Sequence, residues 1–203
     1  MSSGLEVGPT VEWLREPDDR LLRGIHALFT SVVELGGAIG FIEPPSFEET
    51  LGWLQGVLAD VAVGDGGLAL VTDANGAVHA TGCWRRERSA VFRRVAGLHK
   101  IATHPRARTR GLGRTVTQAL IGDASVAGVE VVSLGTRGNN HVAMALYRSL
   151  GFTEWGRLPN CIAVGEERFD DVRMFLAVQP QAHGTALESV EPGTGARRPC
   201  PAG

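Results

Sequence analysis

Apolar and polar positions follow a helical period in four stretches of the chain. Apolar side chains recur there at intervals of three and four residues, which is typical of a helix with one buried face. The pattern predicts helices over residues 18–35, 46–61, 114–126 and 142–150.

Seven shorter stretches alternate between apolar and polar residues or are rich in β-branched residues, which is typical of strands. The predicted strands are residues 11–16, 67–72, 77–84, 95–104, 129–134, 152–155 and 172–178.

Capping and turn residues support these boundaries. Ser46 and Glu49 have the spacing of a capping box at a helix start, and Gly151 is suited to a helix C-terminus. Asn75-Gly76 favours a hairpin turn, because both residues tolerate positive φ.

The order of these elements indicates an α/β or α+β domain built on a central mixed sheet, spanning residues 10–178. The strand at 129–134 is mostly apolar, as expected of a strand buried on both faces. Residues 179–203 are rich in Pro and Gly and lack apolar periodicity, so we expect this tail to be disordered.

Composition narrows the function classes. Hydrophobic residues make up 43% of the 203 residues and the formal net charge is −2, so nothing favours a nucleic-acid or membrane partner overall. Three scattered cysteines provide neither a disulfide framework nor metal-ligand spacing. His79, His104 and His141 have no metal-ligand spacing either, so we expect no metal site. We expect a cytoplasmic protein, because no targeting signal or membrane-length apolar run is present.

The stretch from Leu98 to Arg114 has the features of an anion site. It is a strand that stops at Pro105, then a basic loop containing Gly111 and Gly113, then a helix start. Free N–H groups at a helix N-terminus, with arginines beside them, favour a phosphate or pyrophosphate ligand. The spacing matches neither the Rossmann fingerprint nor a P-loop, and a plain strand–helix connection with solvated arginines is the alternative.

Two motifs resemble the GNAT acyltransferase superfamily. The first is Arg108-x-x-Gly111-x-Gly113, and the second is Asn140-x-x-Ala143-x-x-Leu146-Tyr147-x-x-Leu150-Gly151-Phe152. Within the superfamily, Leu98-His99-Lys100 and Leu158-Pro159-Asn160 are similar to the tabtoxin-resistance acetyltransferase group.

This resemblance implies a mostly antiparallel sheet of about seven strands flanked by four helices. It also implies that the strands holding Ile101 and Leu134 splay apart to admit acetyl-CoA, whose pantetheine pairs with the strand backbone. The cofactor-binding residues that it implies are Ile101, Ala102, Thr103, Arg108, Thr109, Arg110, Gly111, Leu112, Gly113, Arg114, Asn140, Ala143 and Tyr147.

Tyr147, the only tyrosine, is the implied general acid, because a phenol with a pKa of about 10 stays protonated beside a leaving thiolate. Many relatives have a Glu base where this chain has Gly97. His99 lies two residues further along the same strand face and is the alternative base. Water-relayed Asp170, Asp171 or Glu34 remain open for that role.

The loop over residues 36–45 is glycine-rich yet contains Ile39, Phe41 and Ile42. It either packs inward or forms a mobile apolar lid over a substrate, with Glu34 and Glu43 as candidate ligands of a substrate ammonium. The apolar loop favours a small-molecule amine as the acceptor. No well-placed Cys or Ser suggests an acyl-enzyme, so we expect direct transfer from acetyl-CoA, by a monomer or homodimer. A peptide N-acetyltransferase and a non-catalytic CoA-binding module are the alternatives.

Overall fold

The computed structural model describes residues 10–37 and 39–178, so the prediction of a disordered tail lies outside the described residues. Its helices are α1 (Asp19–Glu34), α2 (Phe47–Ala62), α3 (Leu112–Val126) and α4 (His141–Ser149). Its strands are β1 (Glu12–Trp13), β2 (Gly66–Thr72), β3 (Val78–Arg86), β4 (Val95–Thr103), β5 (Val131–Arg137), β6 (Thr153–Val164) and β7 (Glu167–Ala177).

The strands form one seven-stranded sheet in the order β1-β2-β3-β4-β5-β7-β6. Every neighbouring pair is antiparallel except β4 and β5, which are parallel. The α/β class, the mixed sheet and the four flanking helices predicted from the sequence are therefore confirmed.

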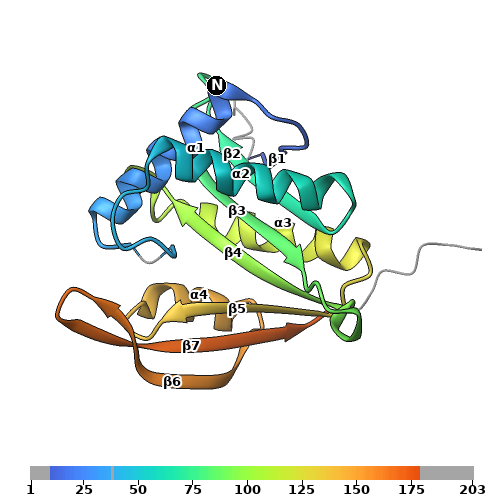
Figure 1. The fold of residues 1–203 in the computed structure, drawn as a ribbon, viewed down its shortest axis with the longest axis vertical. Helices are drawn as coiled ribbons and strands as arrows, with labels where there is room; N and C mark the ends of the chain where they lie inside the picture. Colours follow the sequence, from blue (N-terminus) through green and yellow to red (C-terminus); the bar gives the residue numbers. More distant parts are fainter. Residues whose placement is uncertain (1–9, 38, 179–203) are drawn as a thin grey trace, which may run out of the picture.

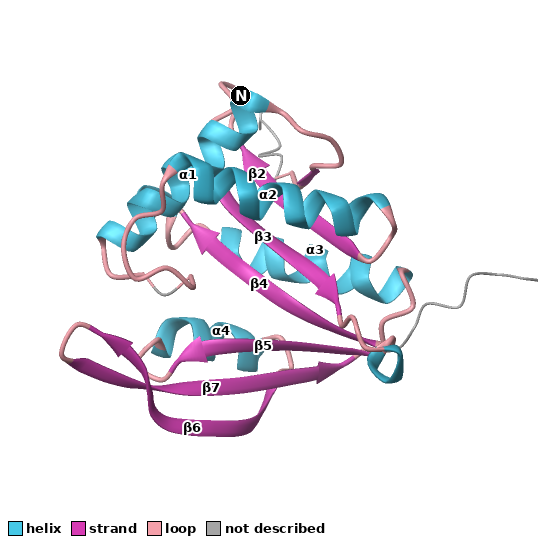
Figure 2. Cartoon of the chain, in the orientation of Figure 1, coloured by secondary structure: helices cyan, strands magenta, loops and turns pink. Residues whose placement is uncertain are grey.

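Helices cover both faces of one half of the sheet. Figure 1 shows α1 and α2 in front of β2, β3 and β4, with α3 behind those strands and α4 behind β5. The front face of β5, β7 and β6 carries no helix in this view (Figure 2).

Two hydrophobic cores lie on opposite faces of the sheet, and β2 contributes to both. Leu68 and Leu70 pack in the core beneath α1 and α2, whereas Ala69 and Val71 pack in the core around α3. Successive side chains of a strand point to opposite faces, so β2 needs apolar residues at every position. This explains the unbroken apolar run in the sequence.

Several predicted boundaries were wrong. The strand expected at 11–16 is only the two-residue β1, and α3 begins at Leu112 instead of at residue 114. β6 and β7 extend far beyond the predicted 152–155 and 172–178, because they pair with each other as a long hairpin. Pro159 and Asn160 disfavour a strand locally, but a register irregularity in β6 accommodates them beside β7.

The sheet splits between β4 and β5. Their parallel pairing joins Val95–Gly97 to Val131–Ser133 and stops there, although β4 continues to Thr103 and β5 to Arg137. The splayed strands implied by the family resemblance are thus present.

A bulge lies at the start of the split. The register of β3 with β4 shifts between Thr81 and Cys83, and the facing Lys100 has φ +49°. Within the described ranges, no helix combines the length and apolar character that crossing a bilayer requires.

Candidate active site

A cavity of about 710 Å³ lies at the split, lined by residues of both β4 and β5. Its walls come mainly from the loop after α1, from β4 and β5, from α4 and from the β6–β7 hairpin. Of the residues predicted to bind cofactor or substrate, the cavity lining includes Ile39, Phe41, Ile101, Asn140, Ala143 and Tyr147. The volume is in the range of about 300–1,000 Å³ that is typical of small-molecule sites.

Tyr147 reaches the cavity from α4. Asn140 caps this helix, accepting a bond from the Ala143 N–H at 3.3 Å, and Gly151 follows its C-terminus with φ +93°. The tyrosine is only 7% exposed and packs against Phe152 with ring centroids 5.8 Å apart. Burial raises the pKa of Tyr147 to about 12, so the phenol holds its proton throughout the neutral range.

His99 and Gly97 lie on the cavity side of β4. A Cβ on Gly97 would stand 2.5 Å from His99 Nε2, which confirms that the two residues share a face. Burial lowers the pKa of His99, and the nearby Arg85 cation lowers it further, so the imidazole is neutral at pH 7. A neutral imidazole in this cavity is able to accept a proton.

Lys100, which the sequence analysis did not select, anchors the loop after α1. Its Nζ donates to the Ile39 carbonyl at 2.9 Å and lies 3.6 Å from the centre of the Phe41 ring. Burial lowers the pKa of Lys100 to about 8. The sequence around Lys100 did not indicate this role, because the residues that Lys100 contacts lie about 60 positions earlier in the chain.

The loop packs inward, which was one of its two predicted states. Ile39 is buried in the core beneath α1 and α2, and half-buried Phe41 lies 6.0 Å from the Phe29 ring. The same loop also lines the cavity through residues 39–42. Ala38 lies outside the described residues.

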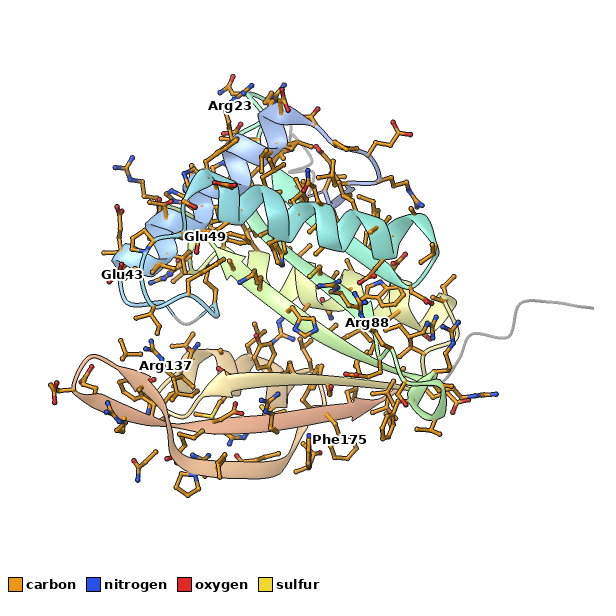
Figure 3. All side chains as sticks on the ribbon, viewed as in Figure 1. Arg23, Glu43, Glu49, Arg88, Arg137 and Phe175 are labelled. Atoms are coloured by element: carbon orange, nitrogen blue, oxygen red, sulfur yellow. The ribbon has the colours of Figure 1, made fainter. Side chains whose placement is uncertain are left out.

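Glu34 and Glu43, predicted as substrate ligands, are not among the residues that line the cavity. Glu34 is the exposed last residue of α1, and Figure 3 shows Glu43 at the outer edge of the molecule. The lining carboxylates are Glu87 and Asp171 instead. Proximity in sequence to the loop was a poor guide to the lining carboxylates, because strand pairing brings these acids to the cavity from β7 and from the end of β3.

The other candidate bases are placed differently. Asp171 lines the cavity, where it accepts from Arg173 Nε at 2.7 Å. Asp170 lies outside the lining, where it accepts from Arg157 and from the Asn160 N–H. Of the carboxylates weighed for the base, only Asp171 faces the cavity.

The predicted anion loop has an open helix N-terminus at its end. Gly111 is the N-cap of α3 with φ +76°, and no side chain within the described structure caps it. Thr109 also has positive φ, and Arg108, Thr109 and Arg110 are exposed. Exposed amides and guanidinium groups at a helix start are suited to a phosphate ligand.

The other residues predicted to bind cofactor in this segment have side chains that contact the protein itself. Leu112 is buried in the core around α3. A Cβ added to Gly113 would stand at ordinary contact distance from the side chains of Thr103 and Leu146. Arg114 Nη2 donates to Ser149 Oγ at 2.6 Å and so links α3 to α4. Ala102 is buried beneath α1 and α2. In the part of the chain that the structure describes, no group of three or more His, Cys, Asp or Glu residues could hold a metal ion.

Comparisons with known proteins agree with this geometry. The family model described as Acetyltransferase (GNAT) family matches residues 9–152. An L-methionine sulfoximine/L-methionine sulfone acetyltransferase of Salmonella typhimurium is 31% identical over 114 residues, which cover 56% of this chain and 66% of that protein. A [ribosomal protein bS18]-alanine N-acetyltransferase of the same organism is 44% identical over 83 residues, or 41% of this chain and 56% of that protein.

The fold also matches solved structures. A GNAT superfamily phosphinothricin acetyltransferase from Sinorhizobium meliloti, in complex with AcCoA, superposes with a TM-score of 0.73 at 21% identity. The superposition covers 93% of this chain and 98% of that one. The matches to the two Salmonella proteins, by contrast, span only about half to two thirds of those relatives' lengths.

Proposed function

The chain belongs to the acetyltransferase (GNAT) family, and from this premise we propose that it transfers the acetyl group of acetyl-CoA to the amine of a small molecule. One observation carries the proposal: the sheet opens between β4 and β5, and the buried phenol of Tyr147 faces the cavity at that opening. A thioester that entered the split would meet an acid on one side and the acceptor cavity on the other.

The cofactor has matching features on this chain. The exposed amides and arginines between Arg108 and Gly111 suit the diphosphate, at the uncapped start of α3. Beyond Gly97, β4 has no pairing with β5, so the backbone near Ile101 and Thr103 is free to pair with a pantetheine amide. Acetyl-CoA supplies the acetyl group as a thioester.

The residues then divide the proton transfers. His99 takes a proton from the acceptor ammonium, which frees the lone pair that attacks the thioester carbonyl. A backbone N–H near Ile101 donates to the oxyanion that develops. Tyr147 donates its proton to the departing sulfur, which leaves as a free thiol. The nitrogen then gives its second proton to the Tyr147 phenolate, so a neutral amide is formed and the phenol is restored.

A compact acceptor fits the cavity better than a long peptide. The inward-packed loop at Ile39–Ile42 closes one wall, and the β6–β7 hairpin contributes Ile162–Val164 to another. The relatives named for methionine sulfoximine and phosphinothricin are consistent with a small amine. The similarity to the bS18-alanine enzyme supports a peptide N-terminus as the second candidate acceptor.

The test is amine-dependent release of thiol from acetyl-CoA, measured over a panel of small amines and N-terminal peptides. We expect at least one small amine to be acetylated and Tyr147→Phe to lower kcat by about 10²- to 10⁴-fold, the usual contribution of a general acid. Acetyl-CoA binding should persist in this variant, because the ring and its packing remain. Binding of CoA without acetylation of any panel member would support the non-catalytic module instead.

A further inference from the structure

Positive charge exceeds negative charge among the side chains that line the cavity. Four cationic residues face two carboxylates there, and the cations are Arg85, Lys100, Arg137 and Arg173. Two of the cations have acidic partners, since Arg85 Nε lies 2.5 Å from Asp60 and Arg173 Nε lies 2.7 Å from Asp171. Among the described residues, Lys100 and Arg137 form no ion pair.

Arg137 is held in place but not neutralised. Its Nη2 donates to the Gly36 carbonyl at 2.5 Å, and its guanidinium lies 4.8 Å from the centre of the Phe169 ring. Its Nε is buried without a hydrogen-bond partner in the described structure. A buried donor left unpaired costs stability, so the guanidinium has hydrogen-bonding capacity that the protein does not use.

Lys100 approaches the same loop from the other side of the split. It donates to the Ile39 carbonyl from β4, whereas Arg137 reaches Gly36 from the end of β5. Figure 3 shows Arg137 between the end of β5 and the loop that follows α1. Both cations bind neutral carbonyls, so two uncompensated positive charges line one cavity next to the same short loop.

We propose that Arg137 and Lys100 form a subsite for a carboxylate on the acceptor, so that the enzyme acetylates amines that also carry a carboxylate. This inference rests on the proposed function. A planar guanidinium matches a carboxylate through paired hydrogen bonds, and the Phe169 ring fixes its plane. A second, point-like cation at Lys100 adds attraction without demanding a particular geometry.

The acceptor amine would then be oriented by its own carboxylate. With the carboxylate at the loop wall, the amine is directed toward the part of the cavity lined by His99 and Tyr147. A matching amine without the carboxylate would leave both cations unpaired and would bind more weakly.

The experiment compares matched pairs of acceptors on the full-length protein. Each pair is an α-amino acid and its decarboxylated amine, and one pair is L-methionine sulfone with 3-(methylsulfonyl)propylamine. For each pair, kcat/KM is measured by thiol release, and binding to the protein–CoA complex is measured by calorimetry. We expect the wild type to prefer the carboxylated members by about 10- to 100-fold, as for a charged hydrogen-bonded pair.

Variants assign the preference to residues. Arg137→Gln and Lys100→Met should each reduce the preference mainly through KM of the amino acid, and Arg137→Lys should restore part of it. KM for acetyl-CoA should stay unchanged in all three. Arg88→Gln is the control, because this exposed surface arginine does not line the cavity. Thermal unfolding of each variant shows whether the fold persists.

Several outcomes would overturn the subsite. Equal binding of both members of every pair, or a preference unchanged in folded Arg137→Gln and Lys100→Met, would remove it. A rise in KM for acetyl-CoA alone would assign these cations to a cofactor phosphate. Selective amino-acid binding without any acetylation would leave the subsite standing and would refute the proposed function instead.

Discussion

At the scale of single residues, the cavity shifts two titratable groups in opposite directions. Burial raises the pKa of Tyr147 to about 12 and lowers the pKa of His99 below its ordinary value. In both cases burial disfavours the charged form, which is the phenolate for tyrosine and the imidazolium for histidine. The result at neutral pH is a protonated phenol and an unprotonated imidazole lining one cavity, which are the states that the proposed acyl transfer needs.

The pH dependence of turnover should therefore depend on His99. Because its pKa is lowered, its base form persists at pH 7 and is lost only as the pH falls below about 6.5, the reference value. We expect kcat/KM to fall on that acidic limb, and His99→Gln to lose the limb and about 10²-fold or more in rate.

Steady-state rates between pH 5 and 9 test this prediction. His79→Gln is the matched control, because His79 pairs with Asp73 at 3.0 Å beside the β2–β3 turn, outside the cavity lining. An unchanged acidic limb in His99→Gln would assign the base to another group, with Asp171 the first candidate.

At the scale of elements, two glycines of α3 have different conformations, one at its start and one in its middle. Gly111 starts the helix in the left-handed region at φ +76°, where an L side chain is strained, and it leaves the first amides exposed. Gly122 lies in the middle of the same helix and has open space around it. The same substitution should therefore have opposite effects at the two sites.

Gly111→Ala should lower the free energy of unfolding by about 1–2 kcal/mol, because alanine is strained in that conformation. Gly122→Ala should raise it by about 0.5–1 kcal/mol, because glycine is the poorer helix former. Urea denaturation measures both changes. KM for acetyl-CoA should rise only in Gly111→Ala, and an equal rise in Gly122→Ala would argue against a phosphate site at the start of α3.

At the scale of the whole molecule, the split divides the sheet into two parts. β4 and β5 are paired only as far as Gly97, while β5 and β7 stay paired from Val131 to Arg137. The split thus leaves an edge of backbone groups within the protein that a ligand is able to satisfy. A ligand that pairs with that edge and contacts α3 would connect the parts.

Acetyl-CoA should therefore stabilise the folded protein. At a concentration of about 100 times Kd, the expected gain is about 2.7 kcal/mol, which raises Tm by roughly 5–10 °C for a domain of this size. Differential scanning fluorimetry measures the shift. Acetyl-pantetheine, which lacks the diphosphate, should give a much smaller shift, and an equal shift with inorganic diphosphate would indicate a simple phosphate-binding protein.

Local patterns in the sequence determined most of the fold. The four helices, the hairpin and the glycine-containing loop before α3 were predicted because capping, periodicity and glycine placement act over a few residues, as at Ser46 and Gly111. His99 and Gly97 were placed on one face for the same reason, since strand alternation is local.

Only the tertiary structure decided which charges line the cavity. Lys100 and Arg137 meet the same loop from strands on either side of the split, and Asp171 arrives from β7. Glu34 and Glu43, close to that loop in sequence, are instead absent from the cavity lining. Side-chain partners across strands depend on register and splay, which are set by non-local pairing and leave no periodic signal in a single sequence.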